Sequence, residues 1–255
     1  ALASSSMVPD TSLACRIMSV WAAPDGIIGK QLARLATRQS KITGCGVLII
    51  SLMASSSSEG LVARMPSGPG PIPDDRIADI TAAAMPPVAT FLLTSETTAE
   101  AIAEHVSRTQ PTTVQIVSHI DVAESRELAE RVPHVRRVQV IHVEGREALD
   151  MISLYSPYVH AFLLDSGRPN AKIAELGGTG RAHDWTISAD FVRASTRPVF
   201  LAGGLSASNV GEAIRQVRPY GLDLCSGVRT DGHLDAAKLD AFMHAVRAAD
   251  MAMSR

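Results

Sequence analysis

The chain has 255 residues and a formal net charge of −2; 46% of its residues are hydrophobic and 4% are aromatic. Its length suits one large domain with a substantial buried core. No run of Lys or Arg is present that would bind nucleic acid or an anionic membrane surface, and the longest strongly apolar stretch, 46–54, is far too short to span a bilayer. We therefore expect neither a nucleic acid nor a membrane as a partner.

The number of cysteines and the first residues of the chain bear on the cellular compartment of the protein. Cys15, Cys45 and Cys225 are too few, and odd in number, for a disulfide framework, which favours a reducing environment. The residues before Met7 lack the basic region of a signal peptide. We expect a cytoplasmic protein whose residues 1–12 form a disordered extension. No His, Cys or Asp cluster has metal-ligand spacing, so no metal is expected.

Strand-like and helix-like segments alternate from about residue 15 onward. The strand candidates are continuous apolar runs, typical of parallel strands covered by helices, at 15–20, 46–52, 88–94, 113–117, 137–143, 160–165, 198–202 and 221–225. The helix candidates lie at 25–38, 74–84, 97–108, 122–132, 145–156, 185–195, 207–217 and 236–249. Eight of each is the number in a closed barrel, whereas an open doubly wound sheet usually has fewer. The sequence predicts an α/β fold, a single (βα)8 TIM barrel over 1–255.

Two glycine turns follow the last two predicted strands. Gly203 and Gly204 come after the seventh strand, and Ser226 and Gly227 after the eighth. Glycine lets backbone N–H groups approach an anion, and a barrel uses the loops after its last two strands to hold phosphate. We therefore expect these four residues to bind the phosphate of a small molecule. The alternative is a pair of tight turns without a ligand.

Three other segments have the composition of loops. Ser55–Ser58 and the Pro/Gly-rich stretch 66–71 predict one long loop before the third strand. Gly177, Gly178 and Gly180 lie after the sixth strand and predict a mobile loop on the catalytic face. A flexible connection with no role in the site is the alternative for these glycines.

Four motifs occur in order in the second half of the chain: LLDS at 163–166, GGTGRAHDW at 177–185, LAGGLSASNV at 201–210 and DLCSGV at 223–228. In this register they closely resemble the phosphoribosylanthranilate isomerase family of tryptophan biosynthesis. The match is strong over about 110–240, looser over 85–110 and poor before 85. The resemblance implies a barrel of the ribulose-phosphate-binding type and an Amadori rearrangement of N-(5-phosphoribosyl)anthranilate to a 1-deoxyribulose 5-phosphate product. It also implies that no cofactor is needed.

The resemblance assigns roles to two carboxylates. Asp165 ends the sixth predicted strand and matches the family's general acid, which protonates the furanose ring oxygen. The apolar residues 162–164 before it could desolvate the carboxyl group and raise its pKa. Asp223 matches an acidic position near the substrate amine. The alternatives are a strand-end Asp165 that bonds its own turn and an Asp223 that pairs with a structural arginine.

The sequence departs from the family at the general base. Members of the family begin with Lys-x-Cys-Gly at the end of the first strand, and the cysteine is the base. Here Met18 aligns with that cysteine, and a thioether cannot accept a proton at neutral pH. Two other placements are a second alignment at 41–44, with Thr43 in the cysteine position, and the Cys225 thiol. His142, within an apolar strand, is more typical of a core histidine than of a ligand.

The departure leaves two alternative functions open. One is a divergent barrel that acts on another phosphosugar with a different base. The other is a catalytically silent relative that keeps phosphate binding. We expect a phosphorylated small molecule as the partner in every case, and either a monomer or a homodimer.

Overall fold

The computed structural model describes residues 16–19, 48–53, 56–63, 72–84, 88–167, 183–231 and 233–253. The strands of the main sheet are β1 (Arg16–Ser19), β2 (Leu48–Met53), β3 (Ser56–Val62), β4 (Ala89–Thr94), β5 (Thr113–Ile116), β6 (Arg136–His142), β7 (Ala161–Asp165), β8 (Val199–Leu201) and β9 (Gly221–Asp223). A two-stranded ribbon of β10 (Arg229–Thr230) and β11 (His233–Leu234) follows β9.

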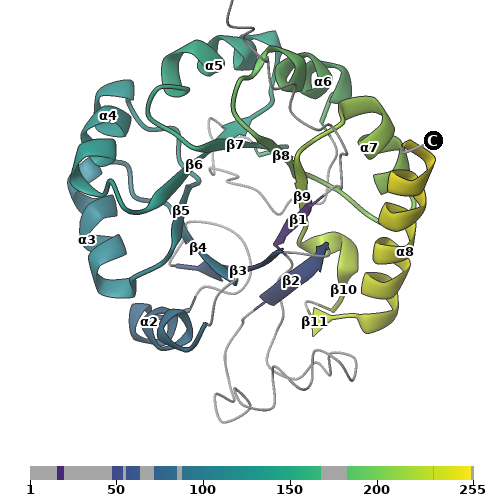
Figure 1. Ribbon diagram of the computed structural model, residues 1–255, viewed down its shortest axis with the longest axis horizontal. Coiled ribbons are helices and arrows are strands. Elements are labelled where there is room, and N and C mark those ends of the chain that lie inside the picture. The colour runs from purple at the N-terminus through teal and green to yellow at the C-terminus, as the bar shows by residue number, and fades with distance from the viewer. Residues whose placement is uncertain are drawn as a thin grey trace, which may run out of the picture.

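The main sheet curls around a central axis. Its nine strands are ordered β1-β9-β8-β7-β6-β5-β4-β3-β2, and every neighbouring pair is parallel except β2 and β3. β1 contacts β2 and β3 as well as β9, so the two ends of the sheet approach each other (Figure 1). The fold is therefore TIM-barrel-like α/β, as the alternating pattern predicted.

Helices surround the sheet on its outer side (Figure 1). They are α2 (Asp74–Ala83), α3 (Ala99–Thr109), α4 (Val122–Arg131), α5 (Asp150–Tyr155), α6 (Trp185–Ala194), α7 (Val210–Val217) and α8 (Ala236–Met253). The helix predicted at 145–156 is instead a 3₁₀ turn, η1 (Arg146–Leu149), that continues into the short α5. The helix predicted at 25–38 lies outside the described residues. None of the helices within the described ranges is long and apolar enough to cross a membrane.

The strand in the second position of the parallel sheet differs from the strand that the sequence predicted there. Ser55–Ser58 was expected in a loop, but Ser56–Val62 forms β3, which pairs in parallel with β4 from Ser58↔Ala89 to Val62↔Leu93. β2, the segment expected in this position, pairs antiparallel with β3. The physical reason is that β4 supplies backbone hydrogen-bond partners for the serine segment, and this tertiary context outweighs its local loop composition.

The core has two layers, one inside the curled sheet and one between the sheet and its helices. The inner layer includes Val138 and Val140 of β6 and Ala161 and Leu163 of β7. Because successive side chains alternate across a strand, His142 and Asp165 fall on the same inner side, at the carboxyl ends of these strands. Residues at this end of the sheet are therefore placed to form a site.

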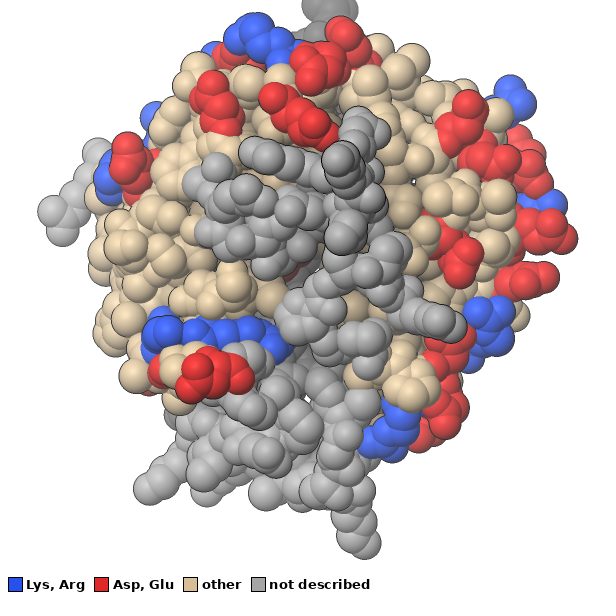
Figure 2. Space-filling view, turned by 180° about the vertical axis from the view of Figure 1, so that it is seen from behind, with Lys and Arg blue, Asp and Glu red and all other residues tan. Residues whose placement is uncertain are grey.

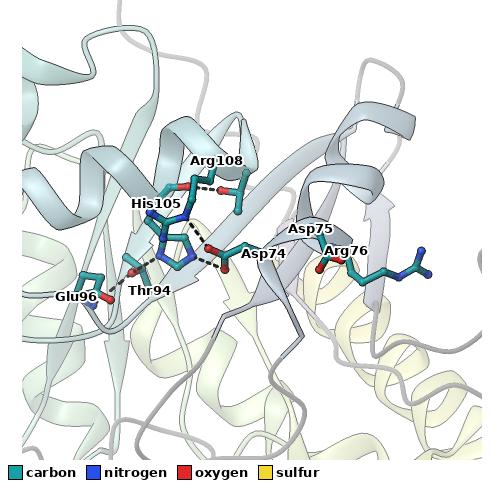
Figure 3. A network of polar contacts seen from close by, with 8 residues as sticks. Asp74, Asp75, Arg76, Thr94, Glu96, His105 and Arg108 are labelled. Atoms are coloured by element: carbon teal, nitrogen blue, oxygen red, sulfur yellow. Dashed lines mark hydrogen bonds and ion pairs between the residues drawn. The ribbon is translucent and has the colours of Figure 1, made fainter.

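A buried polar network joins α2 and α3 to β4 (Figure 3). His105 of α3 is buried, with Nδ1 3.0 Å from Thr94 Oγ1 and Nε2 3.1 Å from Asp74 Oδ1. Arg108 Nε donates to Asp74 Oδ2 at 2.9 Å, and the Glu96 N–H donates to Thr94 Oγ1 at 3.3 Å. His105 thus connects two helices and a strand through both of its ring nitrogens.

His105→Leu is expected to lower the free energy of unfolding by about 1–3 kcal/mol, because it leaves the Thr94 hydroxyl and the Asp74 carboxylate without this partner. Urea denaturation followed by circular dichroism measures the change. Arg76→Leu is the matched control, since it removes only a surface ion pair with Asp79 and is expected to cost at most about 1 kcal/mol. Equal unfolding midpoints for the two variants would contradict the prediction.

Candidate functional site

Asp165 is the last residue of β7 and is buried, with 7% of its surface exposed. Its Oδ1 accepts a hydrogen bond from the Ser166 N–H at 2.7 Å. Burial raises the pKa of the Asp165 carboxyl group above its ordinary value, while the charge of His142 and the Ser166 hydrogen bonds oppose this shift. A carboxyl group with a raised pKa can remain protonated and act as an acid at higher pH than an exposed aspartate.

Asp223 ends β9, and Cys225 follows it by two residues. Leu222 and Leu224 are in the outer layer of the core, so Asp223 lies on the inner side of the sheet, where it is buried. Burial, together with the charges of Asp223 and Asp165, raises the pKa of the Cys225 thiol to about 11, while Arg229 opposes this shift. The thiol therefore lies within electrostatic reach of both carboxyl groups.

The turn after β8 requires its two glycines. Gly203 has φ +84° and Gly204 has φ +62°, a region that side chains with a Cβ rarely adopt. A Cβ on Gly203 would lie 2.9 Å from the Ser166 backbone nitrogen. Asn209 fixes the turn, because its Nδ2 donates to the Gly204 carbonyl at 2.9 Å and its Oδ1 accepts from the Ser206 N–H at 2.8 Å.

The turn after β9 packs against the turn after β8. Ser226 and Gly227 belong to the 3₁₀ turn η2 (Ser226–Val228). A Cβ on Gly227 would lie 1.9 Å from the Leu205 carbonyl oxygen, so only glycine fits without a backbone shift. Because the β8 turn in turn touches Ser166, the ends of β7, β8 and β9 meet in one place, which brings together Asp165 and the four predicted phosphate ligands.

The remaining residues of the sequence prediction lie outside the described ranges, apart from Met18. Gly177, Gly178 and Gly180, Thr43 and the 66–71 stretch lie outside the described residues. Met18 lies in β1, one residue before Ser19, which pairs in register with Asp223. Within the described ranges, no three His, Cys, Asp or Glu side chains are grouped so that they could hold a metal ion.

Sequence reasoning missed the position of His142. It ends β6 and is the register partner of Asp165 on β7, so its Cα lies directly beside that of the acid candidate. Its Nε2 lies 3.0 Å from the Val117 carbonyl oxygen. The signal was present in the sequence, because His142 continues the alternation of Val138 and Val140, but the apolar setting favoured a core histidine.

On the face of the molecule shown in Figure 2, the described Lys and Arg side chains lie in small groups, mostly beside Asp and Glu. Two buried carboxyl groups, Asp165 and Asp223, lie at the carboxyl ends of β7 and β9. A TIM-barrel-like α/β fold with buried titratable groups at this end of its strands belongs to a class whose enzymes carry their active sites there.

Comparisons with known proteins identify the family within that class. The family model described as N-(5'phosphoribosyl)anthranilate (PRA) isomerase matches residues 82–245. N-(5'-phosphoribosyl)anthranilate isomerase 2 of Methanosarcina mazei is 33% identical over 212 residues, which are 80% of this chain and 92% of that protein. The chain belongs to the phosphoribosylanthranilate isomerase family.

Solved structures agree. The phosphoribosyl anthranilate isomerase from Thermococcus kodakaraensis superposes with a TM-score of 0.60 at 27% identity and covers 87% of this chain and 96% of its own. A phosphoribosyl anthranilate isomerase in complex with reduced 1-(o-carboxyphenylamino)-1-deoxyribulose 5-phosphate has a TM-score of 0.62 at 20% identity, with 92% of this chain and 99% of that chain covered. At this lower identity the second likeness shows the fold.

Proposed function

We propose that this chain is a phosphoribosylanthranilate isomerase of tryptophan biosynthesis that converts N-(5-phosphoribosyl)anthranilate to 1-(o-carboxyphenylamino)-1-deoxyribulose 5-phosphate. Membership of the isomerase family supports this activity. The observation that carries it is the meeting of the buried Asp165 with the glycine turns after β8 and β9. A substrate that combines a sugar ring with a phosphate needs an acid and an anion site in one place.

Asp165 is the general acid in this proposal. Burial raises the pKa of its carboxyl group, which favours the protonated form, and the proton is transferred to the furanose ring oxygen as the ring opens to a Schiff base. Removal of the C2 proton by a base then gives the enolamine, which tautomerises to the ketose. The protein only donates and accepts protons in this reaction, and the bond changes occur within the substrate. The reaction therefore needs no cofactor.

The substrate phosphate is held by the backbone of Gly203, Gly204, Ser226 and Gly227. The positive φ angles of Gly203 and Gly204, and the absence of a Cβ at Gly203 and Gly227, let the main chain approach an anion closely. The Asn209 hydrogen bonds preserve this shape without a ligand. Asp223 is buried on β9, and the proposal assigns it to contact with the substrate amine.

Burial raises the pKa of the Cys225 thiol to about 11, so the thiol is a weak candidate for the base. The Met18 thioether cannot accept the C2 proton. Thr43 lies outside the described residues. The proposal therefore assigns the acid and the phosphate ligands but not the base.

The same proposal covers the whole chain. We infer one domain whose sheet closes as an eight-stranded (βα)8 barrel of the ribulose-phosphate-binding type, with β3 as its second strand. The enzyme works in the cytoplasm, as a monomer or a homodimer, without nucleic acid or membrane partners.

Growth of a tryptophan auxotroph that lacks this isomerase tests the activity. The wild-type gene is expected to restore growth without tryptophan, and a purified sample should bind reduced 1-(o-carboxyphenylamino)-1-deoxyribulose 5-phosphate. Failure to restore growth with retained binding would favour the catalytically silent relative that Met18 suggests. Binding of ribulose 5-phosphate with no affinity for the anthranilate compound would favour action on another phosphosugar.

A further inference from the structure

His142 and Asp165 are paired by the sheet itself. They occupy matching positions at the ends of the parallel strands β6 and β7. Neighbouring strands lie about 4.8 Å apart, and both side chains fall on the inner side of the sheet. An imidazole is thus the immediate strand neighbour of the buried carboxyl group proposed as the acid.

The hydrogen bond to Val117 fixes the role of one ring nitrogen of His142. A backbone carbonyl can only accept, so Nε2 carries a hydrogen and donates to the Val117 oxygen at 3.0 Å. Nδ1 is buried and has no hydrogen-bond partner. Nε2 therefore holds the ring in place, and Nδ1 is the ring nitrogen that is left without a partner.

A cavity of about 150 Å³ borders His142, and it is large enough for several water molecules. His119, from the connection after β5, and Glu144 and Glu147, from the segment after β6, line it together with His142. The His142 side chain therefore borders a space that can hold water.

The titratable groups beside His142, in the cavity and on β7, are neutral or acidic. Burial lowers the pKa of His119, and His142 lowers it further, which favours the neutral form of His119. Glu144 and Glu147 are exposed carboxylates, and Asp165 is the buried one. Beyond β9, Cys225 lies within electrostatic reach of Asp165, Asp223 and the cation Arg229. His142 is the register neighbour of Asp165, and an imidazole, unlike a carboxyl group, can carry a positive charge.

We propose that His142 is a positioning residue for the acid: its imidazole sets the charge state of Asp165 and stabilises the buried carboxylate that is left when Asp165 gives its proton to the ring oxygen. A carboxylate in a poorly solvated site is costly unless a cation or hydrogen-bond donor is near it. The positive charge of an imidazolium at this position supplies that stabilisation. The inference rests on the assignment of Asp165 as the acid.

The test compares His142→Gln with His142→Lys. Glutamine keeps an N–H donor for the Val117 carbonyl and removes the titratable charge, whereas lysine makes the charge permanent. The activity of an enzyme with a protonated acid falls as pH rises through the pKa of that acid. Loss of the cation raises the pKa of Asp165, and a permanent cation lowers it. The pH at which kcat/KM falls on the basic side is therefore expected to move up by about one unit in the Gln variant. It is expected to move down by a similar amount in the Lys variant.

His160→Gln is the matched control. His160 lies at the other end of β7, where its Nδ1 accepts from the Arg137 N–H at 3.1 Å, a bond that a glutamine oxygen can replace. In this control, kcat/KM should fall on the basic side at the same pH as in the wild type. The substrate phosphate titrates near pH 6, but it does so equally with every variant and cancels in the comparison.

The titration of the Asp165 carboxyl carbon by NMR gives a second readout that does not need turnover. The Asp165 transition is expected to shift up in His142→Gln, down in His142→Lys and not at all in His160→Gln. The same transition in wild type and His142→Gln would overturn the inference. Shifted transitions in a protein that shows no isomerase activity in any variant would instead contradict the proposed function and leave the coupling of the two residues supported.

Discussion

Replacing Asp165 with asparagine is expected to lower kcat for the isomerisation by about 10²–10⁴-fold, the usual contribution of a general acid. The amide keeps an oxygen that can accept from the Ser166 N–H at the position where Oδ1 now accepts at 2.7 Å. It has no proton to give to the ring oxygen. Binding of the reduced product analogue should change much less than kcat, because the phosphate site is untouched.

A matched control is Asp79→Asn on the outer surface of α2, which removes one carboxylate far from the strand ends. Its kcat should equal that of the wild type. Steady-state fluorescence assays of both variants decide the question: an Asp165→Asn enzyme with wild-type kcat would remove Asp165 from the mechanism.

The same substitution is expected to change how stability depends on pH. Burial raises the pKa of Asp165 above the ordinary value of 3.8, so the folded protein binds this proton more tightly than the unfolded chain does. The resulting stabilisation is fully present below pH 3.8 and is lost as pH rises through the raised pKa. Asp165→Asn has no such loss, so its Tm relative to that of the wild type should increase across this range.

Gly227→Ala is expected to have the second large effect. The new methyl group would lie 1.9 Å from the Leu205 carbonyl oxygen, so the backbone of one turn must move. We expect a loss of about 1–3 kcal/mol in the free energy of unfolding, as in other overpacked sites. A displacement of about 1 Å in the phosphate turns should also lower kcat/KM by about 10²-fold.

Gly211→Ala is the control of opposite sign. Gly211 lies in α7, and its Cβ would meet only the Arg215 Nη1 atom at 3.4 Å, at the far end of a flexible side chain. Alanine in a helix is more stable than glycine by about 0.5–1 kcal/mol. Thermal unfolding should show Gly211→Ala above and Gly227→Ala below the wild-type Tm; a Gly227→Ala protein as stable and active as the wild type would refute the tight packing of the two turns.

The C-terminal two thirds of the fold were predictable because their signals are local. The runs before Asp165 and Asp223 are continuous and apolar, and α7 repeats Val210, Ala213, Ile214 and Val217 on one buried face. The position of β3 was not predictable from composition. Its strand state depends on pairing with β4, which is distant in sequence, whereas the serine run itself is typical of a loop.

The positions of these candidate residues were predictable from the same local signals. Asp165 ends a strand and the two glycine turns each follow one, so parallel topology alone brings them to one end of the sheet. The pairing of His142 with Asp165 depends on the register between β6 and β7, which no pattern within one strand specifies. The role of each site residue in the reaction stays a prediction until the variants above are measured.

The Asn209 bridge has a thermodynamic consequence for ligand capture. The Asn209 side chain already links Gly204 to Ser206 by hydrogen bonds in the free protein. The turn after β8 therefore loses little conformational entropy when an anion binds. Calorimetry should therefore record a small entropic penalty for phosphate association, and Asn209→Ala should weaken affinity mainly through a less favourable entropy while the enthalpy of contact stays nearly constant.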